Sequence, residues 1–205
     1  MAAAMPGTVL VGWLATAVAG IASDVAFDRM GDVGNLVLII YGILITFVQV
    51  WITREAFKQV GIAPALLVGN SLSVYLQGVL IGLGILLGIV LVILPGLYVF
   101  ARWYLASALL VRYGSGRRAA MQRSWDMLAA HWPAALGVGL ILAALSVAPL
   151  VVGEVAPALA VEYGFGWLAA TNLVAAAGIV GGYLAAVSLL LNIEQPAPAL
   201  QEIFG

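Results

Sequence analysis

The hydrophobic pattern along the chain consists of long apolar runs separated by short polar stretches. Each run is long enough to cross the hydrocarbon core of a bilayer, about 30 Å thick, as an α-helix. We predict six membrane-spanning helices, over about residues 7–23, 35–52, 72–94, 96–112, 133–153 and 165–192. Strands of a membrane barrel would alternate apolar and polar residues over about ten positions, and that pattern is absent. The predicted fold is therefore an all-α, polytopic membrane helix bundle.

One amphipathic segment, about residues 116–132, interrupts this pattern. Helical periodicity gives it an apolar stripe of Met121, Trp125, Leu128 and Trp132, opposite Arg118, Gln122 and Asp126. The segment is too short and too polar to cross a bilayer, so we predict an interfacial helix on the membrane surface. We expect it to bind lipid or a partner through Arg117, Arg118, Arg123, Trp125 and Trp132. Alternatively, the stripe packs on the ends of the bundle and the arginines only set the topology.

The composition agrees with a membrane protein. Hydrophobic residues make up 64% of the chain and charged residues 8%, with a mean hydropathy of +1.15, whereas soluble domains carry about 25% charged residues. No stretch outside the predicted spans exceeds about 20 residues, which leaves no room for a soluble catalytic or nucleic-acid-binding domain. We therefore expect one transmembrane domain over residues 1–192 and a flexible tail over residues 193–205.

The placement of positive charge predicts the topology, because Lys and Arg favour cytoplasmic loops. Pro95-Gly96, between the third and fourth spans, fits either a kink in one long helix or a tight reversal. A reversal leaves only Arg29 on the outer side and puts six basic residues together: Arg54, Lys58, Arg112, Arg117, Arg118 and Arg123. We therefore predict a reversal at Pro95-Gly96 on the outer surface, with both the N-terminus and the C-terminus cytoplasmic.

Small and polar residues within the spans are candidates for helix packing or for a cavity. Glycines four residues apart let helices approach closely in lipid, and three such pairs occur: Gly78/Gly82, Gly84/Gly88 and Gly178/Gly182. Asn70, Ser73 and Gln77 share one face at the start of the third span. We expect the glycines to pack helices, and the polar side chains either to hydrogen-bond across helices or to line a polar cavity.

Arg102 is the one charged residue well inside a predicted span, which makes it a candidate functional residue. It lies six residues after Gly96, which is about 9 Å along a helix. A side chain of that length reaches back to the outer headgroups by snorkelling. We favour this structural or lipid-contacting role, with a substrate or ion site as the alternative.

Catalytic chemistry has little support in the sequence. No Asp or Glu lies within a span, and the chain has one histidine and no cysteine. Zinc sites of the two-histidine or cysteine type therefore cannot be assembled within the chain. We expect no catalytic residue, no bound metal and no cofactor.

The residues on either side of the predicted fourth span carry a family resemblance. They are Leu94-Pro95-Gly96-Leu97-Tyr98, Arg102, Ala120 and Arg123-Ser124-Trp125. Over about residues 87–133 this pattern resembles the bacterial glycerophosphoryl diester phosphodiesterase membrane domain family. Ala108, where that family often has a proline, indicates a distant relative. The resemblance implies a six-helix, non-catalytic domain of the bacterial inner membrane, and the phosphodiesterase module found in some members has no space here.

These observations favour a non-enzymatic, multi-pass membrane protein that binds phospholipid or serves as an accessory subunit of a membrane complex. A small-molecule or lipid transporter is the first alternative, because Arg102 and the Asn70–Gln77 face place polar groups within spans. An intramembrane enzyme is the second.

Overall fold

The computed structural model describes residues 6–30, 34–91, 93–155 and 162–194. Within these ranges the long elements are all helices, which confirms the predicted fold class. They are α1 (Pro6–Met30), α2 (Gly34–Gln59), the 3-10 helix η2 (Val68–Asn70), α3 (Ser71–Leu91), α4 (Ile93–Trp103), α5 (Ala106–Tyr113), α6 (Arg117–Met127), α7 (Trp132–Val155) and α9 (Phe165–Glu194). Six helical stretches of the described chain are long and apolar enough to cross a membrane, with α4 and α5 together forming one of them. Residues 195–205 of the predicted tail lie outside the described residues, and residues 193–194 belong to α9.

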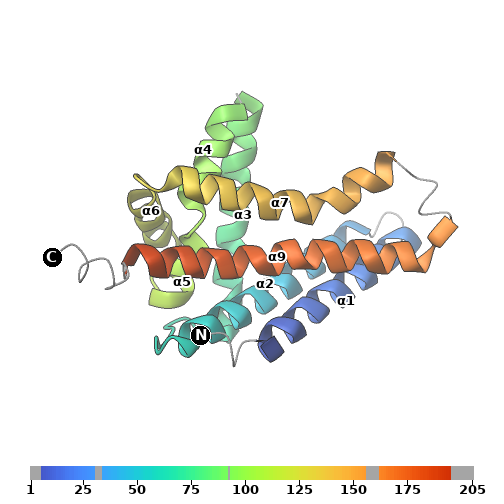
Figure 1. Cartoon of the computed structure of the whole chain (residues 1–205), viewed down its shortest axis with the longest axis horizontal. Helices are drawn as coiled ribbons and strands as arrows, with labels where there is room; N and C mark the ends of the chain where they lie inside the picture. Colours follow the sequence, from blue (N-terminus) through green and yellow to red (C-terminus); the bar gives the residue numbers. More distant parts are fainter. Residues whose placement is uncertain (1–5, 31–33, 92, 156–161, 195–205) are drawn as a thin grey trace, which may run out of the picture.

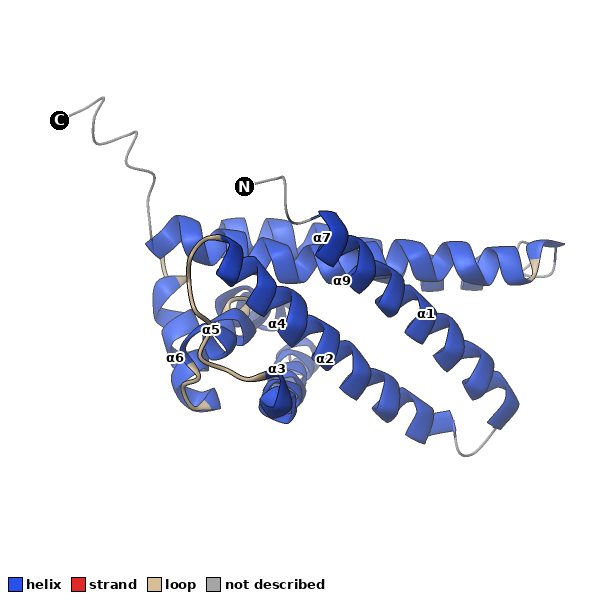
Figure 2. Cartoon of the chain, turned by 90° about the horizontal axis from the view of Figure 1, so that it is seen from below, coloured by secondary structure: helices blue, strands red, loops and turns tan. Residues whose placement is uncertain are grey.

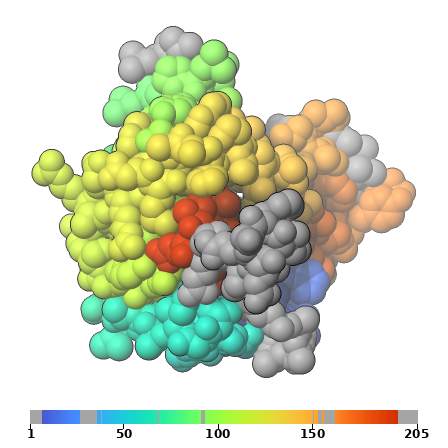
Figure 3. All heavy atoms as spheres, turned by 60° about the vertical axis from the view of Figure 1, so that its left-hand side comes forward, coloured from blue at the N-terminus to red at the C-terminus, as the bar shows by residue number. Residues whose placement is uncertain are grey.

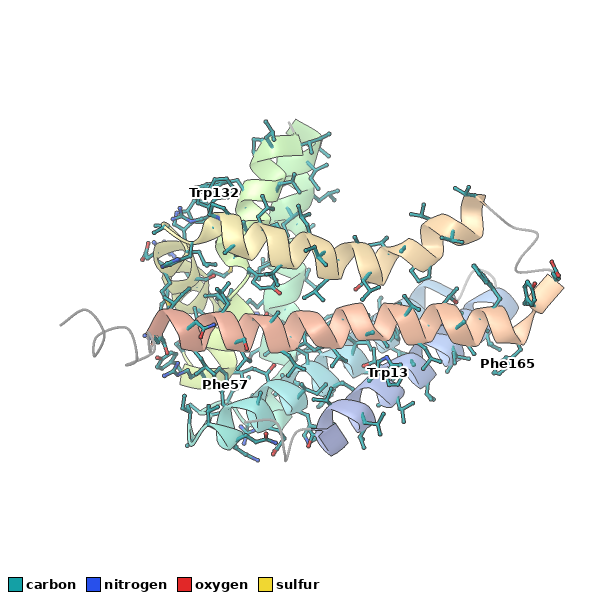
Figure 4. The ribbon with its side chains drawn as sticks, viewed as in Figure 1. Trp13, Phe57, Trp132 and Phe165 are labelled. Carbon is teal, nitrogen blue, oxygen red and sulfur yellow. The ribbon has the colours of Figure 1, made fainter. Side chains whose placement is uncertain are left out.

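The long helices α1, α2, α7 and α9 run along the molecule (Figure 1). α7 and α9 lie side by side, and α1 and α2 pack against each other and against α9. Trp13 connects α1 to α9, because its indole Nε1 donates a hydrogen bond to the Leu173 carbonyl oxygen at 2.8 Å (Figure 4). α1 begins and α9 ends toward the same end of the molecule, where α5 and α6 also lie.

The α3–α4 hairpin does not follow the direction of the other long helices. It crosses α7 and α9 transversely in Figure 1, and Figure 2 shows α3 nearly end-on. α3 ends at Leu91, and α4, which begins at Ile93, packs back along α3, so the predicted reversal is present; Pro95 and Gly96 lie in the first turn of α4. Proline is tolerated there because the first backbone N–H groups of a helix have no helical partner. The hairpin tip projects sideways from the long helices (Figure 1), and its expected position on the outer membrane surface stays a prediction.

Glycine contacts explain how closely α3 and α4 pack. A Cβ atom built on Gly88 would lie 2.6 Å from the Gly96 Cα, and one on Gly96 would lie 2.7 Å from the Ile89 backbone nitrogen. Backbone atoms cannot rotate away as side chains do, so only glycine fits at these two positions.

The six glycines singled out by spacing do not share one role. Gly84, Gly88 and Gly178 lie at close contacts, against the Trp103 ring, the Gly96 backbone and the α7 backbone respectively. The expected packing role does not extend to Gly78, Gly82 and Gly182, because a Cβ atom at these positions would meet nothing within 4 Å. Spacing identifies a helix with small residues but not which of its faces meets another helix.

The buried core surrounds α5 at the end of the molecule where α6 lies. Leu105, Leu109 and Val111 are each fully buried, and the loop after α2 is tied to α5 by backbone hydrogen bonds to the Arg112 and Val111 carbonyl oxygens. Gly114 ends α5 in the left-handed conformation, with φ of 60°, and its N–H donates to the Leu110 carbonyl oxygen. This compact end of the bundle is what positions α6.

Candidate functional site

Helix α6 and its C-terminal cap residue pack on α4 and α5 through one buried face. Ala120, Ser124 and Leu128, spaced four residues apart, are 1%, 0% and 0% exposed. The predicted interfacial helix over 116–132 is shorter in the structure: α6 ends at Met127, and Trp132 begins α7. The apolar stripe predicted for that segment therefore does not form a single face, because its last member lies on a different helix.

Arg102, near the end of α4, lies in the buried contact between α4 and α6. Its side chain is enclosed (the residue is 7% exposed), and Nη1 donates a hydrogen bond to the Tyr98 hydroxyl oxygen at 2.7 Å. Its Cζ atom lies 4.5 Å from the centroid of the Trp125 ring, in cation–π geometry. The Ser124 hydroxyl donates to the Arg102 carbonyl oxygen at 2.8 Å, which fixes α6 against the end of α4. The expected snorkelling of Arg102 toward the outer headgroups is therefore corrected.

Tyr98 and Trp125 flank this arginine, and further aromatic rings pack on these two. The Tyr98 ring meets Trp125 and Trp132 edge-on, with centroids 5.7 Å and 5.5 Å apart, and Trp103 lies 6.1 Å from Trp125. Figure 4 shows Trp132 at the start of α7, beside the base of α4. We call Tyr98, Trp103, Trp125 and Trp132 the aromatic cage. Trp132, which the sequence suggests as a lipid contact, is half-buried and packs on Tyr98 of the cage.

Replacing Arg102 with lysine should lower the free energy of unfolding by about 1–2 kcal/mol, because a lysine cannot stack on Trp125 and reach Tyr98 with one planar group. Unfolding of the purified protein in detergent, followed by tryptophan fluorescence, measures this difference. Arg118→Lys, at an exposed position of α6, is the matched control and should leave stability unchanged. Equal stability of Arg102→Lys and the unmodified protein would show that any long cation suffices.

A groove of about 840 Å³ opens between α3, α4 and α6. Leu80, Trp103 and Trp125 give it apolar walls, and Arg117 and Arg118 lie along it on α6. Both arginines are exposed and make no salt bridge with a described residue. The first backbone N–H groups of α6 lie beside them, and a helix N-terminus favours negative charge. The groove combines unneutralised positive charge with an apolar wall.

Arg123 lies outside this groove, in an ionic network at the end of α9. Glu194 forms salt bridges with Arg112 and, at 3.4 Å, with Arg123. The Tyr113 hydroxyl donates to the Glu194 carboxylate at 2.8 Å and accepts from Arg123 at 3.1 Å. Figure 3 shows the end of α9 in red between α6 and α7 in yellow and α2 in teal. Arg123 therefore joins α6 to α5 and α9, while its side chain stays about half exposed and its contact with lipid stays a prediction.

The polar residues at the start of α3 (Asn70, Ser73 and Gln77) lie in two different environments. Asn70 and Ser73 line a smaller cavity of about 330 Å³, which shares Arg117 with the groove. Gln77 is fully buried, and neither its amide nitrogen nor its amide oxygen has a hydrogen-bond partner among the described residues. Burying an amide without hydrogen bonds costs free energy. The sequence did not indicate that Gln77 would be separated from Asn70 and Ser73.

Several residues of this region carried no signal in the sequence. Leu80 is one of many leucines on α3, and nothing local indicates that it faces α6 rather than lipid. Glu194, at the end of the last span, contacts Arg123 across 71 positions of sequence. In the described part of the chain, no three His, Asp or Glu side chains gather where they could hold a metal ion.

Comparison with known proteins identified no relative of this chain. No family model, curated protein or solved structure matches the chain. The resemblance of Tyr98, Arg102, Ser124 and Trp125 to the phosphodiesterase membrane domain pattern stays a prediction, although these four residues meet in one contact.

Proposed function

We propose that this is a non-enzymatic, multi-pass membrane protein that binds an anionic phospholipid in the groove beside α6. The observation that carries the proposal is the pair of unneutralised arginines, Arg117 and Arg118, lying along a groove with walls of Leu80, Trp103 and Trp125. A phospholipid has the same two parts, a charged phosphate headgroup and an apolar chain. Each cation near an anionic bilayer surface contributes about 1 kcal/mol of attraction.

The charges at the two ends of the bundle support a cytoplasmic position for the groove. The end of the molecule that contains α6 also contains Lys58, Arg112 and Arg123, whereas Glu162 precedes α9 at the opposite end. Positive residues favour the cytoplasmic side, so we place the groove in the cytoplasmic leaflet, with α1 beginning and α9 ending on that side. The bacterial inner membrane follows from the family resemblance alone.

Neutralising both groove arginines should weaken binding of an anionic phospholipid by about 30-fold, which corresponds to two cations at about 1 kcal/mol each. The variant is Arg117→Gln with Arg118→Gln, in nanodiscs with increasing fractions of phosphatidylglycerol in phosphatidylcholine. Native mass spectrometry of the released protein counts the retained phosphatidylglycerol molecules.

The matched control is Arg54→Gln with Lys58→Gln, which removes two positive charges from α2 at the same end of the molecule, outside the groove and away from the network that holds α6. It should retain phosphatidylglycerol as the unmodified protein does. Equal losses in the two double variants would mean that net charge, not the groove, attracts the lipid, and the proposal would fail.

A further inference from the structure

A second cavity lies in the middle of the bundle, separate from the groove. It has a volume of about 310 Å³ and lies between α2, α7, α9 and the junction of α4 with α5. It shares no lining residue with the groove. Its polar side chains are Gln49, Thr53, Tyr104, Ser107, Ser146 and Tyr183.

Four of these side chains have no hydrogen-bond partner among the described residues: Gln49, Thr53, Ser107 and Tyr183. Hydroxyl groups in membrane helices commonly bond to the carbonyl oxygen one turn earlier, as Thr16 and Thr46 do at 2.8 Å. Thr53 makes no such bond, although the residue is only 3% exposed. The polar atoms of these four side chains are not fully enclosed by protein, so their free donors and acceptors are open to the cavity. A molecule bound there can supply the hydrogen bonds that lipid cannot supply.

The wall combines these polar side chains with a larger apolar area, to which Phe100, Leu142 and Ile179 contribute. No charged residue lines the cavity, and an ion inside a membrane requires a counter-charge or extensive solvation. Hydroxyl and amide groups both donate and accept hydrogen bonds. The volume lies at the lower end of the range of small-molecule pockets, about 300–1,000 Å³. We propose that this cavity binds a small uncharged polyol through Gln49, Thr53, Ser107 and Tyr183.

Gly182 provides a direct test, because it lines the cavity and a Cβ atom there would meet nothing within 4 Å. The Cβ atom of Gly182→Val would therefore fit without displacing a neighbour, and its two methyl groups should fill part of the cavity. Gly82→Val is the matched control, because Gly82 is equally open but lies on α3, away from the cavity. Thr53→Val removes one unpartnered hydroxyl and keeps the side-chain shape.

The probes are erythritol and xylitol, and their binding to the protein in nanodiscs is measured by saturation-transfer difference NMR. We expect saturable binding to the unmodified protein and to Gly82→Val, a loss of at least about tenfold in Gly182→Val, and a loss of about five- to tenfold in Thr53→Val. Phosphatidylglycerol retention, which reports on the groove, should not change in either cavity variant. Failure of one site is therefore distinguishable from failure of the other.

Two results would overturn the inference. The first is the absence of saturable binding of either polyol to the unmodified protein, which would mean that water alone satisfies the four side chains. The second is unchanged binding in both Gly182→Val and Thr53→Val, which would place the polyol elsewhere on the protein.

Discussion

Replacing Gly178 with valine should lower the free energy of unfolding by about 3 kcal/mol, at the upper end of the usual effect of overpacking. A Cβ atom at this position would lie 2.6 Å from the Leu142 carbonyl oxygen and 2.7 Å from the Ser146 backbone nitrogen. Both are backbone atoms of α7, so no side-chain rotation relieves the overlap. α7 and α9 would have to separate along the contact that holds the bundle together in Figure 1.

The control for this prediction is one helical turn away. Gly182→Ala introduces a Cβ atom that meets nothing within 4 Å, and its effect on stability should stay within about 0.5 kcal/mol. Unfolding of both variants in mixed detergent micelles, monitored by circular dichroism, gives the two differences. Equal stability of Gly178→Val and Gly182→Ala would contradict the close approach of α7 and α9.

Hydropathy predicted the helices well because each apolar run is one helix or one pair of helices. Two boundaries were missed for different reasons. α4 stops at Trp103 and α5 begins at Ala106 without an intervening proline or glycine, so no local signal marks the break. The end of α6 had a signal, since Pro133 lies in the first turn of α7 and proline is favoured at helix starts.

The candidate site was predictable only in part. The sequence identified Arg102, Trp125 and the α6 arginines as unusual in an apolar chain, and the structure brings Arg102 and Trp125 together. The sequence did not separate the roles of Arg118 and Arg123, because the difference depends on a carboxylate 71 positions from Arg123. Contacts between distant segments decide which arginine is neutralised and which remains available to a ligand.

The orientation of the α3–α4 hairpin was also beyond the sequence, and it has a measurable consequence. α9 has 30 residues, about 45 Å of helix, which suffices to cross the hydrocarbon core with its ends at the interfaces. A hairpin transverse to α9 does not cross the bilayer in the same direction (Figures 1 and 2). Its tip is apolar and projecting: Val90 and Leu94 are each 74% exposed. We therefore expect the tip to lie in hydrocarbon, out of contact with water on either side.

Single cysteines test this expectation cleanly, because the chain has none of its own. In sealed membrane vesicles of known orientation, Glu162→Cys should react with an impermeant maleimide from one side only, and Ser115→Cys from the opposite side only. Leu94→Cys should react from neither side, although it is exposed on the protein surface and should react fully once the protein is unfolded in detergent. The contrast between protected and fully labelled thiols is expected to be nearly complete.

A hairpin that crosses the bilayer as two ordinary spans would give a different result. Its turn would then reach the surface, and Leu94→Cys would react from the same side as Glu162→Cys. Protection of Leu94→Cys from both sides, with the two controls reacting from opposite sides, fits four crossing helices and one hairpin held within the membrane. In that arrangement Leu80 and Trp103, which line the groove from the hairpin, lie at acyl-chain depth, while Arg117 and Arg118 lie at the level of the headgroups.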